Sequence, residues 1–151
     1  MKKIFRQLIR QTFVPVALVT TFLIAGTASG KAQPTIQVRN QSNFTPISSP
    51  GQSGGSVDSK NCGFVAQSPN QVLNVTERID YLRVKVEATG GEPTLLVDGP
   101  DGRFCVLADG ISGDSPEISG VWLPGRYSVY VGDRSGSQHE YTLYVSQQVN
   151  N

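Results

Sequence analysis

Five aspartates that could bind a metal ion lie in Gly-rich or Pro-rich segments whose composition predicts turns. Ca²⁺ takes about six to eight oxygen ligands, which carboxylates and turn carbonyls supply. If calcium binds, Asp98, Asp101 and Asp109 are the expected ligands, and the role of the ion would be structural. Their spacing matches no EF-hand loop, and aspartate also favours turns for its own hydrogen bonds to the backbone. Calcium is therefore a hypothesis, and no cofactor is required.

Aromatic side chains form a second candidate site, for an external ligand. Alternation along two expected strands places Tyr130 and Tyr144 together on an outer face, where flat rings suit sugar rings or extended peptides. Trp122, the only tryptophan, either joins that site or fills the core beside Leu123, and core placement is the favoured interpretation. If the two tyrosines are adjacent, the expected partner is an extracellular polysaccharide or protein.

A catalytic site is not expected. The Gly-Asp-Ser-Pro sequence at 113–116 resembles part of a serine-hydrolase signature, and His139 could complete a triad with an aspartate. A nucleophile elbow needs a strand, a sharp turn and a helix, whereas Ser115 lies in a Gly/Pro turn. Carboxylate pairs for glycoside hydrolysis depend on separation in space and cannot be excluded by counting. We interpret the chain as non-catalytic and His139 as a solvated residue.

Cys62 and Cys105 are the only cysteines. Two cysteines and one histidine are few for a thiolate or imidazole metal site, and there is no Cys-x-x-Cys motif. We expect a structural disulfide, with two free thiols as the alternative. A disulfide between them would close a loop of roughly 40 residues and contribute roughly 3–4 kcal/mol to the free energy of unfolding, because it restricts the unfolded chain. Cys62 should open the first strand, and Cys105 should lie in the middle of a strand at 103–107.

The first 32 residues have the layout of a secretory signal peptide. Four basic residues precede an apolar stretch at 12–25, and small residues follow at 28–32. The alternative is an uncleaved membrane anchor, although the apolar stretch is shorter than the roughly 20 residues that span a bilayer. We therefore expect a secreted or periplasmic protein with no membrane span after leader removal.

Removal of residues 1–32 changes the net charge. Five of the 13 basic residues lie in that segment, which leaves eight basic against 12 acidic side chains and a net charge of about −4. A mildly acidic chain without a basic run has no electrostatic footprint for nucleic acid. DNA and RNA are therefore excluded as partners.

Composition divides the remainder into three parts. Residues 33–60 are rich in Gln, Ser, Gly and Pro and poor in large apolar residues, which predicts a flexible linker. Residues 61–146 form the expected compact domain, which is large enough for one small core. Residues 147–151 are a short C-terminal tail.

Strict alternation of apolar and polar residues predicts half-buried strands at 82–88, 126–131 and 141–146. Segments rich in Gly, Asp and Pro lie between the strands, at 98–102 and 132–136 among others, and predict tight turns. No helical window of useful length follows the leader. About eight short strands at regular spacing favour an all-β fold, an antiparallel β-sandwich of jelly-roll type.

Five short segments follow one another in a recognisable order: a strand at 81–86, a Pro-Thr-Leu strand at 93–97, an Asp-Gly-Pro-Asp-Gly turn at 98–102, a Pro-Gly-Arg-Tyr hairpin at 124–127 and a closing strand at 141–143. In this order residues 70–146 resemble the bacterial pre-peptidase C-terminal domain. The resemblance implies a secreted β-sandwich that serves as an accessory module. Such domains usually follow a peptidase or another large catalytic domain, and their acidic pair after the middle strand is reduced here to Asp109 with Gly110.

The expected function is that of a secreted, non-catalytic binding module for an extracellular polysaccharide or protein. One alternative is an accessory or regulatory partner of a secreted peptidase, acting in trans. Another is a structural protein of the cell envelope.

Overall fold

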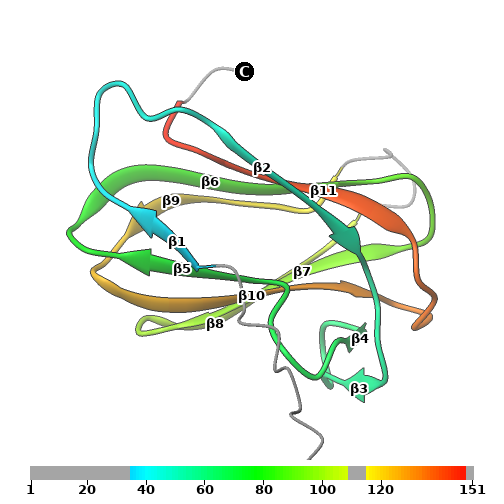
Figure 1. Ribbon diagram of the computed structural model, residues 1–151. Helices are drawn as coiled ribbons and strands as arrows, with labels where there is room; N and C mark the ends of the chain where they lie inside the picture. The colour runs from blue at the N-terminus through cyan, green and yellow to red at the C-terminus, as the bar shows by residue number, and fades with distance from the viewer. Residues whose placement is uncertain (1–34, 109–114, 149–151) are drawn as a thin grey trace, which may run out of the picture. The chain divides into compact units, whose positions relative to one another are not determined.

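The computed structural model describes residues 35–108 and 115–148. The expected leader, Asp109 and the end of the C-terminal tail lie outside the described residues. The described part holds 11 strands in two sheets, which form the two layers in Figure 1. None of its segments is a helix long and apolar enough to cross a membrane.

The first sheet has four strands, and every neighbouring pair is antiparallel. In spatial order the strands are β2 (Ile47–Gln52), β11 (Glu140–Ser146), β6 (Ile79–Ala88) and β9 (Glu117–Trp122). We call this the four-stranded sheet.

The second sheet has seven strands, and β10 (Gly125–Asp133) runs through its centre. On one side β10 pairs with β5 (Gln71–Val75), which pairs in turn with β1 (Thr35–Val38). On the other side β10 pairs with β7 (Pro93–Gly99), and β7 pairs with β8 (Gly102–Leu107). Two short strands, β4 (Phe64–Val65) and β3 (Val57–Asp58), extend from the end of β10.

The core lies between the inner faces of the two sheets. Along β6, β10 and β11 the predicted alternation is confirmed, because every second residue is buried in one apolar cluster. Members of that cluster include Val84, Val86, Tyr127, Val129 and Leu143. The all-β sandwich expected from the sequence is therefore observed.

The predicted flexible linker at 33–60 is wrong for the residues that the structure describes. Strand β1 pairs in parallel with β5, and β2 pairs with β11 from Gln52 to Ile47. Val38 and Phe44 are buried in the core. A segment with few apolar residues is ordered here because its backbone completes sheets that other strands have begun. The sandwich therefore begins before residue 61, has more strands than the expected eight, and contains one parallel pair.

The disulfide between Cys62 and Cys105 is confirmed, with a Cα–Cα distance of 5.7 Å. Cys105 lies within β8, as predicted. Cys62 does not open a strand, since it lies in the loop between β3 and β4. In that loop its backbone N–H donates to Ser59 Oγ at 3.0 Å. The disulfide therefore joins the β3–β4 loop to β8.

Candidate functional site

Two edge strands, β8 of the seven-stranded sheet and β9 of the four-stranded sheet, lie on the same side of the sandwich. Among the described residues, β8 pairs only with β7, and β9 pairs only with β6. Between these two edge strands lies a hollow of about 450 Å³. Its lining is mainly apolar and comes from both sheets. We call it the edge hollow.

Gly120 of β9 lines the edge hollow. Ile118, Gly120 and Trp122 pair in register with three buried residues of β6, so these positions of β9 face the core. Gly120 has no side chain to fill its place, and a Cβ built there would meet nothing within 4 Å. Its φ of +142° also favours glycine over other residues.

The mouth of the edge hollow carries three exposed apolar side chains. Phe104 pairs in register with buried Val97 and so faces inward, yet it remains 47% exposed because β8 is an edge strand. Val121 is 52% exposed and Leu123 is 40% exposed. All three line the hollow. We call Phe104, Val121 and Leu123 the apolar rim, and exposed apolar groups that gather around a hollow mark binding surfaces.

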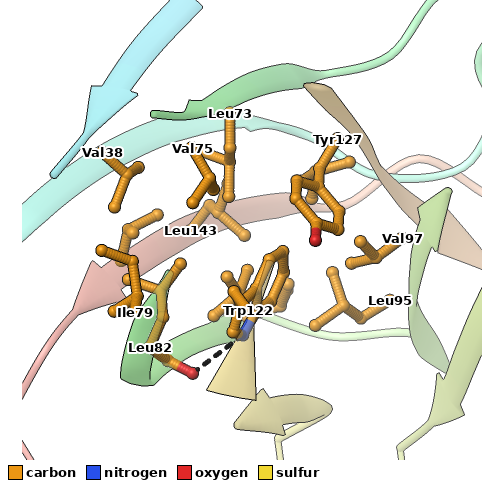
Figure 2. Close-up of a cluster of buried hydrophobic side chains, with 14 of the residues drawn as sticks. Val38, Leu73, Val75, Ile79, Leu82, Leu95, Val97, Trp122, Tyr127 and Leu143 are labelled. Carbon is orange, nitrogen blue, oxygen red and sulfur yellow. Dashed lines mark hydrogen bonds between the residues drawn. The ribbon is translucent and has the colours of Figure 1, made fainter. Parts of the chain in front are cut away.

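Trp122 forms the inner wall of the edge hollow. Its side chain is buried, which confirms the favoured interpretation, and its Nε1–H donates to the Leu82 carbonyl oxygen at 3.1 Å (Figure 2). Its ring meets that of Tyr127 edge to face, with centroids 4.7 Å apart. Because the indole N–H is bonded to the backbone, Trp122 presents only its apolar ring to a ligand.

Tyr127 connects the core to the turn between β7 and β8. Its hydroxyl lies 3.0 Å from Asp101 Oδ2 and 2.9 Å from the Leu123 carbonyl oxygen, and can donate to either. Burial and the nearby Asp101 carboxylate raise the pKa of Tyr127 to about 12. The ring lies against Gly99, where a Cβ would overlap it. Among the described residues that line the edge hollow, Asp101 is the one with a charged side chain.

The predicted calcium ligands are not gathered into a site within the described residues. Asp101 accepts from Tyr127, while Asp98 lies exposed on β7 opposite Arg103 of β8. Asp109 lies outside the described residues. In the part of the chain that is described, no group of three or more His, Cys, Asp or Glu side chains could hold a metal ion.

The two tyrosines of the predicted aromatic site lie on different sheets, so the expectation that they share a face is wrong. Tyr130 belongs to β10 and packs against the small cluster of Cys62, Val65 and Leu96. Tyr144 belongs to β11 in the other sheet and is 36% exposed. Alternation gave each side chain an outward direction correctly. It could not show that β10 and β11 belong to different layers.

Tyr130 does share a surface with another predicted residue. It lines a shallow hollow of about 260 Å³ with Asp98, Arg103 and Ser59. The guanidinium of Arg103 donates from Nη2 to the Ser59 carbonyl oxygen at 2.9 Å. This surface therefore brings together one predicted calcium ligand and one predicted ring, but it is neither a metal site nor a paired aromatic platform.

His139 lies beside the buried carboxylate of Asp133. Burial alone would raise the pKa of Asp133, but hydrogen bonds from Ser135 and the Glu92 backbone, with the nearby His139, hold it below its ordinary value. Asp133 Oδ1 accepts from Ser135 Oγ at 2.6 Å, and Asp133 Oδ2 accepts from Glu92 N at 2.9 Å. This carboxylate orders the turn after β10. The serine that it bonds is Ser135.

The edge hollow was not predicted from the sequence. Its signal was Gly120, placed between Ile118 and Trp122 at the spacing of one strand face. A glycine inside a strand pattern marks a bulge or an open space, and here the β6–β9 register does shift between Ile79 and Leu82.

Three solved structures are similar to this chain. The pre-peptidase C-terminal domain of collagenase from Bacillus anthracis is 15% identical, with a TM-score of 0.49, over 77% of this chain and 98% of that one. PliG, a periplasmic inhibitor of g-type lysozyme from Aeromonas hydrophila, has a TM-score of 0.37 with 17% identity, over 76% of this chain and 98% of that one. CorA, a surface-associated copper-binding protein of Methylomicrobium album BG8, has a TM-score of 0.40 with 10% identity, over 76% of this chain and 99% of that one. The first of these structures is a pre-peptidase C-terminal domain, the kind of domain that the sequence resembles.

Sequence comparison gives a nearer relative. A search against models of protein families finds no match. The uncharacterized protein Synpcc7942_2126 of Synechococcus elongatus is 43% identical over 100 residues, which cover 64% of this chain and 72% of that protein. At this identity and coverage, the chain belongs to the same family as the Synechococcus elongatus protein.

Proposed function

We propose that the chain is an exported, non-catalytic module that binds a protein partner at the edge hollow. The observation that carries this proposal is the hollow of about 450 Å³ whose mouth is surrounded by the exposed side chains of the apolar rim. Apolar concave sites with few polar groups are typical of ligand and partner binding. Among the described residues, the outer edges of β8 and β9 at this site have no pairing strand.

The disulfide supports export. The bond between Cys62 and Cys105 joins the β3–β4 loop to β8, and such bonds persist in oxidising compartments. The layout of the first 32 residues agrees with this location. The proposed site of action is therefore the periplasm or the extracellular space.

The lining of the edge hollow favours a protein over a polysaccharide. A sugar needs several polar partners around a flat ring, but here Trp122 is buried and its N–H is bonded to Leu82. Asp101 supplies the charged group of the lining. The exposed ring of Tyr144 and the half-buried ring of Tyr130 lie on different sheets and form no common platform.

The apolar rim alone would not give tight binding. Completing the burial of three half-exposed side chains contributes on the order of 3–4 kcal/mol. Association costs roughly 4–15 kcal/mol in lost freedom. A partner must therefore also place a group inside the hollow, and a surface contact with the rim alone is not sufficient.

Peptide selection tests this function. A random library displayed on phage is selected on the full chain, and each recovered peptide is titrated against the wild type, Phe104→Asp and Leu107→Asp. Leu107 is a matched control because it is also an exposed apolar residue of β8, at 43%, but does not line the hollow. The only tryptophan, Trp122, reports occupancy of the hollow through its fluorescence.

We expect the selected peptides to change Trp122 fluorescence and to bind Leu107→Asp as they bind the wild type. Binding to Phe104→Asp should weaken about tenfold or more. Peptides that bind all three chains equally, with no change in Trp122 fluorescence, would place binding elsewhere and overturn the proposal.

A further inference from the structure

We propose that the edge hollow takes an extended peptide segment that pairs with the free edge of β9. One apolar side chain of this segment fills the space at Gly120, and a basic side chain lies beside Asp101. This inference rests on the proposed function and names the class of ligand.

The free edge of β9 supplies the pairing surface. Within the described residues, β6 is the one strand that pairs with β9. Proteins commonly protect edge strands with charged side chains, Pro or bulges. β9 has no Lys or Pro, and its charged residue is Glu117 at its first position, which leaves residues 118–122 uncharged. Ser119, Gly120 and Val121 line the hollow, so a strand added here would run along its mouth.

Gly120 supplies the pocket for a side chain. In an added strand, alternate side chains point toward the core, and the one beside Gly120 meets the gap that this glycine leaves. An engineered cavity of about 150 Å³ is enough to hold benzene. The edge hollow is about 450 Å³, which is volume enough for a leucine, methionine or phenylalanine side chain.

Asp101 supplies the charge preference. Its Oδ2 lies 3.0 Å from the Tyr127 hydroxyl, and a carboxylate has further acceptor sites for a second donor. The residue is exposed. A lysine two positions from the apolar anchor lies on the same face of an extended segment and can reach this carboxylate.

The same charge argument disfavours a second copy of this chain as the occupant. If two copies paired through β9, each would offer Glu117 as the charged residue of the added strand and no basic residue for Asp101. A foreign segment that carries Lys or Arg complements the site instead.

Synthetic peptides test the inference on the full chain. The probe is acetyl-Thr-Ser-Leu-Thr-Lys-Thr-Ser-amide, and its relatives carry Glu for Lys or Ser for Leu. Two further peptides are N-methylated, one at Leu and Lys and the other at the flanking Ser and Thr. Because alternate N–H groups of a strand point to opposite edges, only one of these two methylations removes the donors that face β9.

The protein variants are Asp101→Asn, Asp101→Lys and, as a matched control, Asp98→Asn. Asp98 is also exposed and lies near the same turn, but it does not line the edge hollow. Dissociation constants come from Trp122 fluorescence and calorimetry. Melting temperatures show that each variant is folded.

We expect one N-methylated peptide to lose about tenfold or more in affinity while the other retains binding. Replacing the Leu of the peptide with Ser should lower the affinity by at least the same factor. Exchanging Lys for Glu should weaken binding to the wild type about fivefold and strengthen binding to Asp101→Lys. Asp101→Asn should abolish the preference for Lys, and Asp98→Asn should keep it.

The inference is overturned if both N-methylated peptides bind alike, if the Lys preference survives in Asp101→Lys, or if no peptide binds below about 1 mM. A dimer in sedimentation that Val121→Lys dissolves would assign β9 to a second copy, which also contradicts it. In each case the proposed function is judged separately, by whether library-selected peptides distinguish Phe104→Asp from Leu107→Asp.

Discussion

The rings of Trp122 and Tyr127 meet edge to face, 4.7 Å apart at their centroids and inclined by 60°. Trp122 ends the edge strand of one sheet, and Tyr127 lies on the central strand of the other. This contact therefore joins the two layers at the inner end of the edge hollow (Figure 2). The hydrogen bonds of both residues end on the backbone or on Asp101, which fixes the shape of the hollow.

Replacing Trp122 with Phe should lower the free energy of unfolding by about 2–3 kcal/mol. The change removes the bond from Nε1 to Leu82 O, loses buried apolar surface and leaves that carbonyl without its indole partner. Urea denaturation followed by circular dichroism measures the loss. Val121→Thr, an exposed change on the same strand, should shift the free energy by less than about 0.5 kcal/mol. A loss of equal size in the two variants would contradict the role given to the indole.

Tyr127 should titrate late and make stability fall at alkaline pH. Its pKa is raised from 10.0 to about 12 in the folded chain, so folding favours the protonated phenol. The stabilisation is complete below pH 10 and is lost as the pH rises through about 12. Phenolate absorbance across this range should show one fewer late-titrating group in Tyr127→Phe. Asp101→Asn should move the transition of Tyr127 toward lower pH, and an unchanged transition would remove Asp101 as a cause.

Asp133 should make stability fall at acid pH. Its pKa in the folded chain lies below its ordinary value, because donors from Ser135 and Glu92 outweigh its burial. The stabilisation is present above the unfolded value of about 3.9 and is lost as the pH falls through the lowered folded value. Urea denaturation at several pH values should show that Asp133→Asn is less stable at pH 7 and that the difference shrinks in acid. Asp80→Asn, at an exposed site, is the control.

Phe44→Ala should destabilise the chain by about 3 kcal/mol. The side chain is buried in the main core although it belongs to the segment that composition assigned to a linker. A flexible linker would tolerate the change with no measurable loss. Thermal unfolding of Phe44→Ala beside Thr45→Ala, an exposed neighbour, distinguishes these outcomes.

Local pattern was sufficient for much of the fold. Alternation at 82–88 and 141–146 predicted two central strands of the four-stranded sheet, because one face of each is core and the other is solvent. The Cys62–Cys105 bond followed from cysteine count and the expected export. The favoured placement of Trp122 in the core is also confirmed, although Leu123, beside which it was expected to pack, is 40% exposed.

Pairing between distant segments was not visible in the sequence. Residues 47–52 contain Ser, Pro and Gly and look unstructured alone, yet they are ordered by β11, almost a hundred residues further along the chain. The edge hollow could not be predicted from the sequence for the same reason. Gly120 becomes informative only once β8 and β9 are known to end their sheets on one side, and local propensity contains no such information.

The pairing of β2 with β11 also constrains the order of folding. Ile47 lies opposite Val145, and β11 is the strand that joins β2 to β6. Before β11 has been synthesised, β2 lacks the one strand with which it pairs among the described residues, and the four-stranded sheet has only β6 and β9. Contacts between residues so far apart in the sequence make folding slow and cooperative. The four-stranded sheet therefore closes only after β11 has been synthesised, and a chain truncated before β11 should remain susceptible to proteases.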